Sequence, residues 1–149
     1  MQLIAIKNLF KKFNKLRTVH VGTHGYACKV QSVNLSANDR EVTKVTGVHQ
    51  NGKSHSDVVL FLSESKTFNF IPKNLVNYFN NLDTVIFKSA NIGTVTKYDL
   101  QQFGEKLIKL RLPHNQLEVI DVDLFEYTPN IAYLSLSSNP FKHISKGSM

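Results

Sequence analysis

The most regular feature of the chain is a pattern of apolar positions between residues 107 and 120, where the sequence reads LIKLRLPHNQLEVI. Leucine or isoleucine stands at positions 107, 110, 112, 117 and 120, and Asn115 lies between them. This spacing fits neither a continuous helix nor a strand that alternates throughout. It predicts a short strand with Leu110 and Leu112 on one face, a turn at Asn115, and a return segment.

The same pattern recurs at a nearly constant interval along the chain. A second copy spans Ile131–Ile144 and has Asn139 in the place of the asparagine. A third copy begins at Leu82, with Ala90 at that place, and a weaker fourth copy begins at Val58. One such unit cannot bury its own apolar face, so the pattern predicts a stack of repeats.

We divide residues 57–149 into units near 58–81, 82–106, 107–130 and 131–149. Upstream, valine and leucine alternate with polar residues on both sides of the turn-rich segment SANDRE, and the loop HQNGKSHS follows. This arrangement predicts a β-hairpin and a flexible loop within residues 26–56. Because a repeat array needs its first edge covered, we expect this hairpin to act as an N-terminal cap.

The N-terminal segment 1–25 also carries part of the repeat pattern. Residues 8–26 align with residues 74–92, and seven of nineteen positions are identical. Either the chain is cut from a longer array, or the cap is inserted between repeats, and we favour the first reading. The apolar residues Leu3, Ile6, Phe10 and Phe13 would also share one face of a basic amphipathic helix. Ordinary packing of this face into the core is the simpler interpretation.

These repeats resemble the leucine-rich repeat pattern LxxLxLxxNxL, whose units span roughly 20–29 residues. The resemblance implies an α/β fold: a leucine-rich repeat solenoid, or short horseshoe, with parallel strands on its concave face. The segment YACKV…GKSHSDVVLFL, with TFNFIPKNLVNYFNNL after it, is similar to secreted leucine-rich repeat proteins of insects. That similarity covers Tyr26–Ile144 and implies an extracellular or membrane-tethered protein that binds other proteins.

The net charge of +7 is concentrated at the N-terminus, where every charged side chain up to Asn38 is basic. A nucleic-acid binder would spread its charge along the fold, so nucleic acid is disfavoured as a partner. The alternative function is a basic membrane- or nucleic-acid-surface binder acting through Lys7–Arg17. A third alternative is a fragment without independent function. Lysines also interrupt any N-terminal hydrophobic run, so no clear signal peptide is present, and a cytoplasmic location stays open.

Strand residues between the inward leucines point out of the predicted concave sheet. They form a patch with a basic centre that suits a protein partner, in particular one with an acidic surface. The candidate partner-binding residues are Thr84, Ile86, Lys88, Lys109, Arg111, His114, Tyr133 and Ser135. For any single one of them, an ordinary solvated position on the sheet is the simpler interpretation. The binding hypothesis applies to the face as a whole.

Other polar residues suggest structure more than chemistry. Asn115 and Asn139 are expected to satisfy backbone groups at the turns. Asn34 opens the one N-glycosylation sequon, and Cys28 has no second cysteine to pair with. His20 and His24 would share a metal only on a helix, which their strand and turn context disfavours. No nucleophile, phosphate-loop or metalloprotease motif occurs, so we expect no enzyme, no cofactor and no small-molecule substrate.

Overall fold

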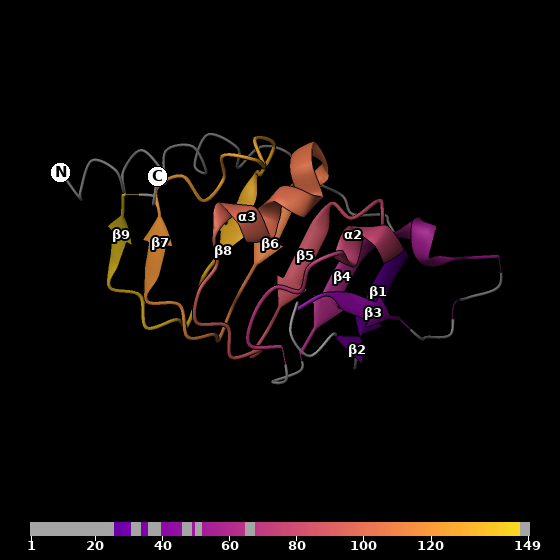
Figure 1. Ribbon diagram of the computed structural model, residues 1–149, viewed down its shortest axis with the longest axis horizontal. Helices are drawn as coiled ribbons and strands as arrows, with labels where there is room; N and C mark the ends of the chain where they lie inside the picture. Colours follow the sequence, from indigo (N-terminus) through magenta and orange to yellow (C-terminus); the bar gives the residue numbers. More distant parts are fainter. Residues whose placement is uncertain are drawn as a thin grey trace.

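Five short strands from successive parts of the chain lie side by side in one parallel sheet (Figure 1). In their order across the sheet they are β1 (Tyr26–Val30), β4 (Val58–Ser63), β5 (Thr84–Phe87), β6 (Lys109–Arg111) and β8 (Tyr133–Ser135). This computed structural model describes residues 26–30, 34–35, 40–45, 49, 52–64 and 68–146. The basic N-terminal segment 1–25 lies outside the described residues, so the predictions for it stay predictions.

Equivalent residues of successive repeats stand opposite one another in the sheet. Phe61 pairs with Val85, Val85 with Leu110, and Leu110 with Leu134. The first three are fully buried, whereas Leu134 packs against the core and is partly exposed. Burying each such side chain contributes about 1.5–3 kcal/mol. The inward positions of the sequence pattern therefore form one column through the core.

The return segments differ along the chain. The first two repeats contain helical turns, and the later two contain short strands that form a separate parallel pair (Figure 1). The helical turns are α2 (Leu75–Tyr78), α3 (Lys97–Leu100) and η2 (Gln101–Lys106); the strands are β7 (Val119–Asp121) and β9 (His143–Ser145). Mostly parallel strands with few helices fit the predicted α/β repeat fold.

The segment predicted as a hairpin is divided between two sheets. Tyr26–Val30 does not join a hairpin but pairs with β4 in the parallel sheet, so that part of the prediction is corrected. The antiparallel pair is shorter and consists of β2 (Asn34–Leu35) and β3 (Val42–Lys44). In β1, Cys28 stands opposite Phe61, and the short helical turn η1 (His55–Asp57) lies at the end of the predicted loop. Without β1, the edge of β4 would present unpaired backbone groups, and the pairing with β1 satisfies them.

The short hairpin is tied to the first repeats through its second strand. Val42 donates its N–H to the carbonyl of Lys73 at 3.1 Å, and Lys73 donates to the carbonyl of Arg40 at 2.8 Å. Val42 is only 5% exposed and belongs to the main core. Backbone hydrogen bonds and one buried side chain therefore attach β3 next to α2.

The asparagine turns connect neighbouring repeats. Asn115 is 2% exposed, and its Oδ1 accepts the N–H groups of Ala90 at 3.0 Å and Ile92 at 3.1 Å. Its Nδ2 donates to the carbonyl of Phe87 at 2.8 Å. One turn later, Asn139 accepts the N–H of Leu117 and donates to the carbonyl of Leu112. Each asparagine thus satisfies backbone groups of the preceding repeat.

A second row of inter-repeat bonds lies at the other end of the strands, directly before each repeat's first apolar residue. Asn81 donates to the carbonyl of Ser56 at 2.8 Å, and Asn130 donates to that of Glu105 at 2.9 Å. Between them, Lys106 donates to the carbonyl of Asn80 at 2.8 Å. The two rows hold successive repeats at both ends of the strands.

Candidate functional site

The strand register brings most of the predicted partner-binding residues together. Thr84 stands opposite Lys109, which stands opposite Tyr133. In the next row of the sheet, Ile86 stands opposite Arg111, which stands opposite Ser135. Lys88 follows directly after β5, and His114 lies in the turn after β6. We call Ile86, Lys109, Arg111, Tyr133 and Ser135 the sheet-face patch.

The members of this patch differ in exposure from the inward column. Tyr133 is 47% exposed, and the other four members of the patch are partly exposed. Thr84 is the exception, because it is only 1% exposed and its hydroxyl donates to the Asp83 carboxylate at 2.7 Å. Packing and this local hydrogen bond withdraw Thr84 from the surface. Its assignment as a partner-binding residue is therefore corrected.

The three basic residues near the patch have different surroundings. Lys88 lies 3.4 Å from the carboxylate of Glu64, and both side chains are well exposed. The ammonium of Lys109 lies 5.5 Å from the ring centroid of Tyr133, within the range of a cation–π contact. Arg111 has neither contact, and its buried Nε has no hydrogen-bond partner within the described part of the chain. Among these three residues, Arg111 is thus the one with a buried donor left unpaired.

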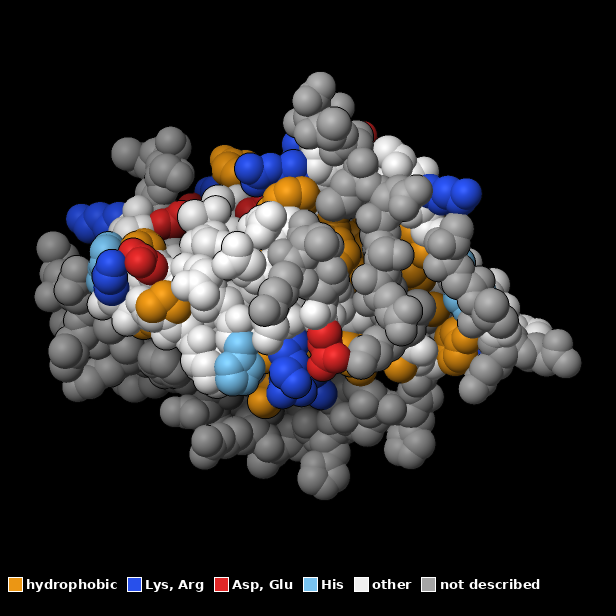
Figure 2. Space-filling view, turned by 90° about the horizontal axis from the view of Figure 1, so that it is seen from below, with side chains coloured by type: hydrophobic (Ala, Val, Ile, Leu, Met, Phe, Trp, Pro, Cys, Tyr) orange, Lys and Arg blue, Asp and Glu red, His pale blue; other side chains and the backbone are white. Residues whose placement is uncertain are grey.

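Charged groups also lie near the turns that follow the strands. Figure 2 shows the molecule from below, with basic side chains and acidic ones beside them. Hydrophobic side chains gather toward the side of the molecule where β1 and β4 lie. His114 is exposed, and its backbone has a positive φ of 55°. Its N–H donates to the carbonyl of Ser137 at 3.0 Å. His114 therefore holds a turn at the border of the patch and lies outside its strand rows.

Two apolar residues extend the same face and were missed from the sequence. Leu60 and Leu62 of β4 stand opposite Thr84 and Ile86, and both are partly exposed. Applying the alternation of inward and outward positions to β4 finds them, because Phe61 between them is buried. The face therefore changes from apolar residues on β4 to basic residues on β6.

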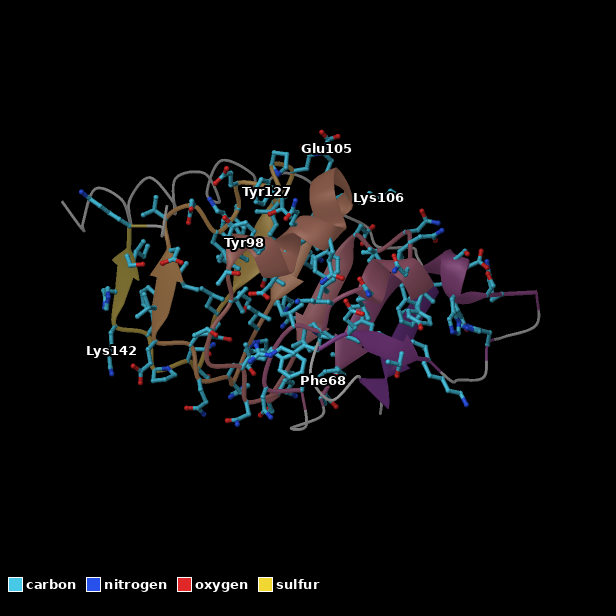
Figure 3. The ribbon with its side chains drawn as sticks, in the orientation of Figure 1. Phe68, Tyr98, Glu105, Lys106, Tyr127 and Lys142 are labelled. Carbon is cyan, nitrogen blue, oxygen red and sulfur yellow. The ribbon has the colours of Figure 1, made fainter. Side chains whose placement is uncertain are left out.

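A second polar cluster, also missed from the sequence, lies on the side of the return segments. The ammonium of Lys97 is 2.8 Å from the Asp123 carboxylate and 2.5 Å from that of Glu126. Hydrogen bonds to Asp123 first, and then to Glu126, raise the pKa of Lys97. The same ammonium lies 5.5 Å from the ring of Tyr98 and 5.8 Å from that of Tyr127, and both tyrosines are labelled in Figure 3. The two rings are tilted by 44°, with centroids 6.1 Å apart. The cluster joins two repeats through one lysine.

The described residues contain no group of three histidine, cysteine, aspartate or glutamate side chains that would hold a metal ion. No helix among them is long and apolar enough to cross a membrane. Asn34 is the first residue of β2, where it stands opposite Lys44.

Residues 105–149 match the family model described as leucine rich repeat. The match identifies leucine-rich repeats in this C-terminal part of the chain, so the sequence-based prediction of such repeats is confirmed there. Searches of curated proteins and of solved structures found no match. Leucine-rich repeat domains are generally non-catalytic and are typical of protein–protein interaction.

Proposed function

We propose that this protein recognises another protein through the sheet-face patch and does not act as an enzyme. In this proposal the repeats form a short solenoid, the patch lies on its concave face, and the β2–β3 hairpin caps the first repeats. The observation that carries the proposal is the register, which aligns Lys109 with Tyr133 and Arg111 with Ser135. Tyrosine and arginine are enriched among the few residues that contribute most of the binding energy at protein interfaces.

We further propose an acidic surface on the partner. None of the acidic residues in the described ranges forms an ion pair with Lys109 or Arg111. A carboxylate of the partner could accept two hydrogen bonds from the guanidinium of Arg111, whose side chain is partly exposed. Next to it, Ile86, Leu60 and Leu62 offer apolar surface for the centre of the contact, where water is excluded.

The first prediction is that Arg111→Glu weakens partner binding at least tenfold, because it replaces a donor with a like charge facing an acidic surface. Binding is measured by quantitative pull-down with the full chain as bait. Lys146→Glu makes the same charge change at an exposed position after β9 and serves as the control. Equal retention of the partner by wild type and Arg111→Glu would remove this surface from the proposal. Circular dichroism checks that both variants are folded.

A further inference from the structure

Two imidazole rings converge beside β1, away from the sheet-face patch. Nε2 of His49 lies within hydrogen-bonding contact of Nδ1 of His55, and the ring centroids are 4.5 Å apart. His55 belongs to η1, at the β1 end of the sheet in Figure 1. The two residues are six positions apart in sequence, and both are partly exposed. An ion in solution can therefore reach the pair.

Neighbouring aromatic residues hold both rings in place. Nδ1 of His49 lies 3.2 Å from the hydroxyl of Tyr26, which assigns that ring nitrogen to a structural hydrogen bond. The ring of His55 stacks on Phe79 with centroids 5.2 Å apart, and Phe79 is fully buried. His49 Nε2 and His55 Nδ1 point at one another, so these two nitrogens are placed to share one partner.

We propose that His49 and His55 together bind one divalent transition-metal ion of the zinc or copper type. Neutral imidazole nitrogen is a preferred ligand of these ions, whereas magnesium and calcium prefer oxygen. In the site, His49 keeps its proton on Nδ1 and donates it to the Tyr26 hydroxyl, a contact of the kind that usually orients a metal-bound histidine. His55 carries its proton on Nε2, so each ring presents one lone pair to the ion.

Solvent or a further ligand completes the coordination. Asp57 is close to His55 in sequence, but its carboxylate accepts the N–H of Ser54 at 2.9 Å and is already engaged. A site with two protein ligands binds more weakly than the closed four-ligand sites that are typical of structural zinc. The bound ion would link the loop at His49 to η1 and, through Tyr26, to β1. Its expected effect is to stabilise the first edge of the sheet.

The second prediction is that zinc binds tag-free wild-type protein at one ion per chain and raises its melting temperature, since a ligand of the folded state stabilises it. His49→Gln and His55→Gln each remove one ligand and should weaken binding at least tenfold. Tyr26→Phe should weaken it by about tenfold or more, because outer contacts of a ligand typically matter to that extent. Calorimetric titration with zinc chloride measures all of these variants.

Substitutions of the other histidines serve as controls for this test. His114→Gln and His143→Gln remove described histidines elsewhere, and His20→Gln with His24→Gln removes those of the N-terminal segment; all should keep the zinc response. Equal zinc binding by wild type and by the double variant His49→Gln, His55→Gln would overturn the proposal. If the variants fail to fold in EDTA, modification of the wild type by diethylpyrocarbonate decides instead. Zinc should protect His49 and His55, and absence of that protection would overturn the site.

Discussion

At the scale of single residues, buried polar side chains connect the repeats. Asn115 accepts two backbone N–H groups of the preceding repeat and is nearly inaccessible to water. Leaving a buried backbone donor without its acceptor lowers the free energy of unfolding by about 1–3 kcal/mol, so the loss of this one side chain should destabilise the fold substantially. At the same place in the preceding repeat, Ala90 has no side-chain amide, and its own N–H instead depends on Asn115.

The third prediction concerns this asparagine. Asn115→Ala should lower the free energy of unfolding by about 2–4 kcal/mol, because it leaves the N–H groups of Ala90 and Ile92 without acceptors. Asn130→Ala is the matched control, since Asn130 is exposed and makes one bond to a carbonyl. Urea unfolding followed by circular dichroism measures both variants. Similar losses in the two would show that burial of the amide does not set its contribution.

The sequence predicts the outward strand residues but not all of their surroundings. Alternation places Lys109 and Arg111 on the outer face, because the side chains of a strand alternate between its two faces. It also places Thr84 there, yet packing buries that side chain. The contact between His49 and His55 is a tertiary one, and no periodicity of the sequence records it. Local pattern therefore identifies the face, and tertiary packing determines which members of it are accessible.

At the scale of elements, two short helical turns begin in the same way. Thr96 donates its N–H and its hydroxyl to the Asp99 carboxylate, at 2.7 and 2.9 Å. Ser54 makes the same pair of bonds to Asp57, and its N–H bond lowers the pKa of the Asp57 carboxyl. Both are the sequence pattern of a capping box, Ser or Thr followed three residues later by an acid. This signal could have predicted where α3 starts.

The fourth prediction is that Thr96→Ala lowers stability by about 0.5–2 kcal/mol, the usual range for losing a residue at the start of a helix. The substitution removes the hydroxyl bond to Asp99 and leaves the backbone bond in place. Thermal unfolding compares it with Thr96→Ser, which keeps the hydroxyl and should retain most of the stability. A Thr96→Ser variant as unstable as Thr96→Ala would assign the effect to the lost methyl group instead.

Whether a return segment forms a helix or a strand could not be predicted from the apolar pattern of the sequence. The apolar residue that follows the asparagine turn is Val95 in one repeat, Ile120 in the next and Ile144 in the last. Val95 precedes a helix, whereas Ile120 and Ile144 lie in paired strands. The difference follows from the residues after it, since Thr96 begins a capped helix and Asp121 does not. The apolar spacing is the same in all three, so it carries no information about this choice.

At the scale of the whole molecule, each repeat depends on its neighbours. The strand column and both rows of inter-repeat bonds connect adjacent units only, as expected for a one-dimensional array. A cluster of buried aromatic residues adds to this at the N-terminal side, where Phe61 lies 5.7 Å from Phe79 and 5.3 Å from Phe87. Stability should therefore pass from repeat to repeat through shared interfaces.

The fifth prediction tests this coupling. Leu110→Ala creates a cavity in the central column and should cost about 2–5 kcal/mol. Hydrogen exchange should become faster in β5 and β8 as well as in β6, because both neighbours pack on the altered repeat. Ile144→Ala, in the last strand, should accelerate exchange mainly in β7 and β9. Unchanged protection of β5 and β8 in Leu110→Ala would show that the repeats unfold independently.

The two rows of inter-repeat bonds also set where a repeat can change in length. From Asn81 to Ala90, from Lys106 to Asn115 and from Asn130 to Asn139 the chain advances by the same number of positions. The length of the return segment is not constant, because the stretch from Ala90 to Lys106 is one position longer than the stretch from Asn115 to Asn130. Insertions and deletions are therefore accommodated on the return side, while the strand side keeps a fixed length. A grafted or lengthened repeat should preserve the strand side and vary the rest.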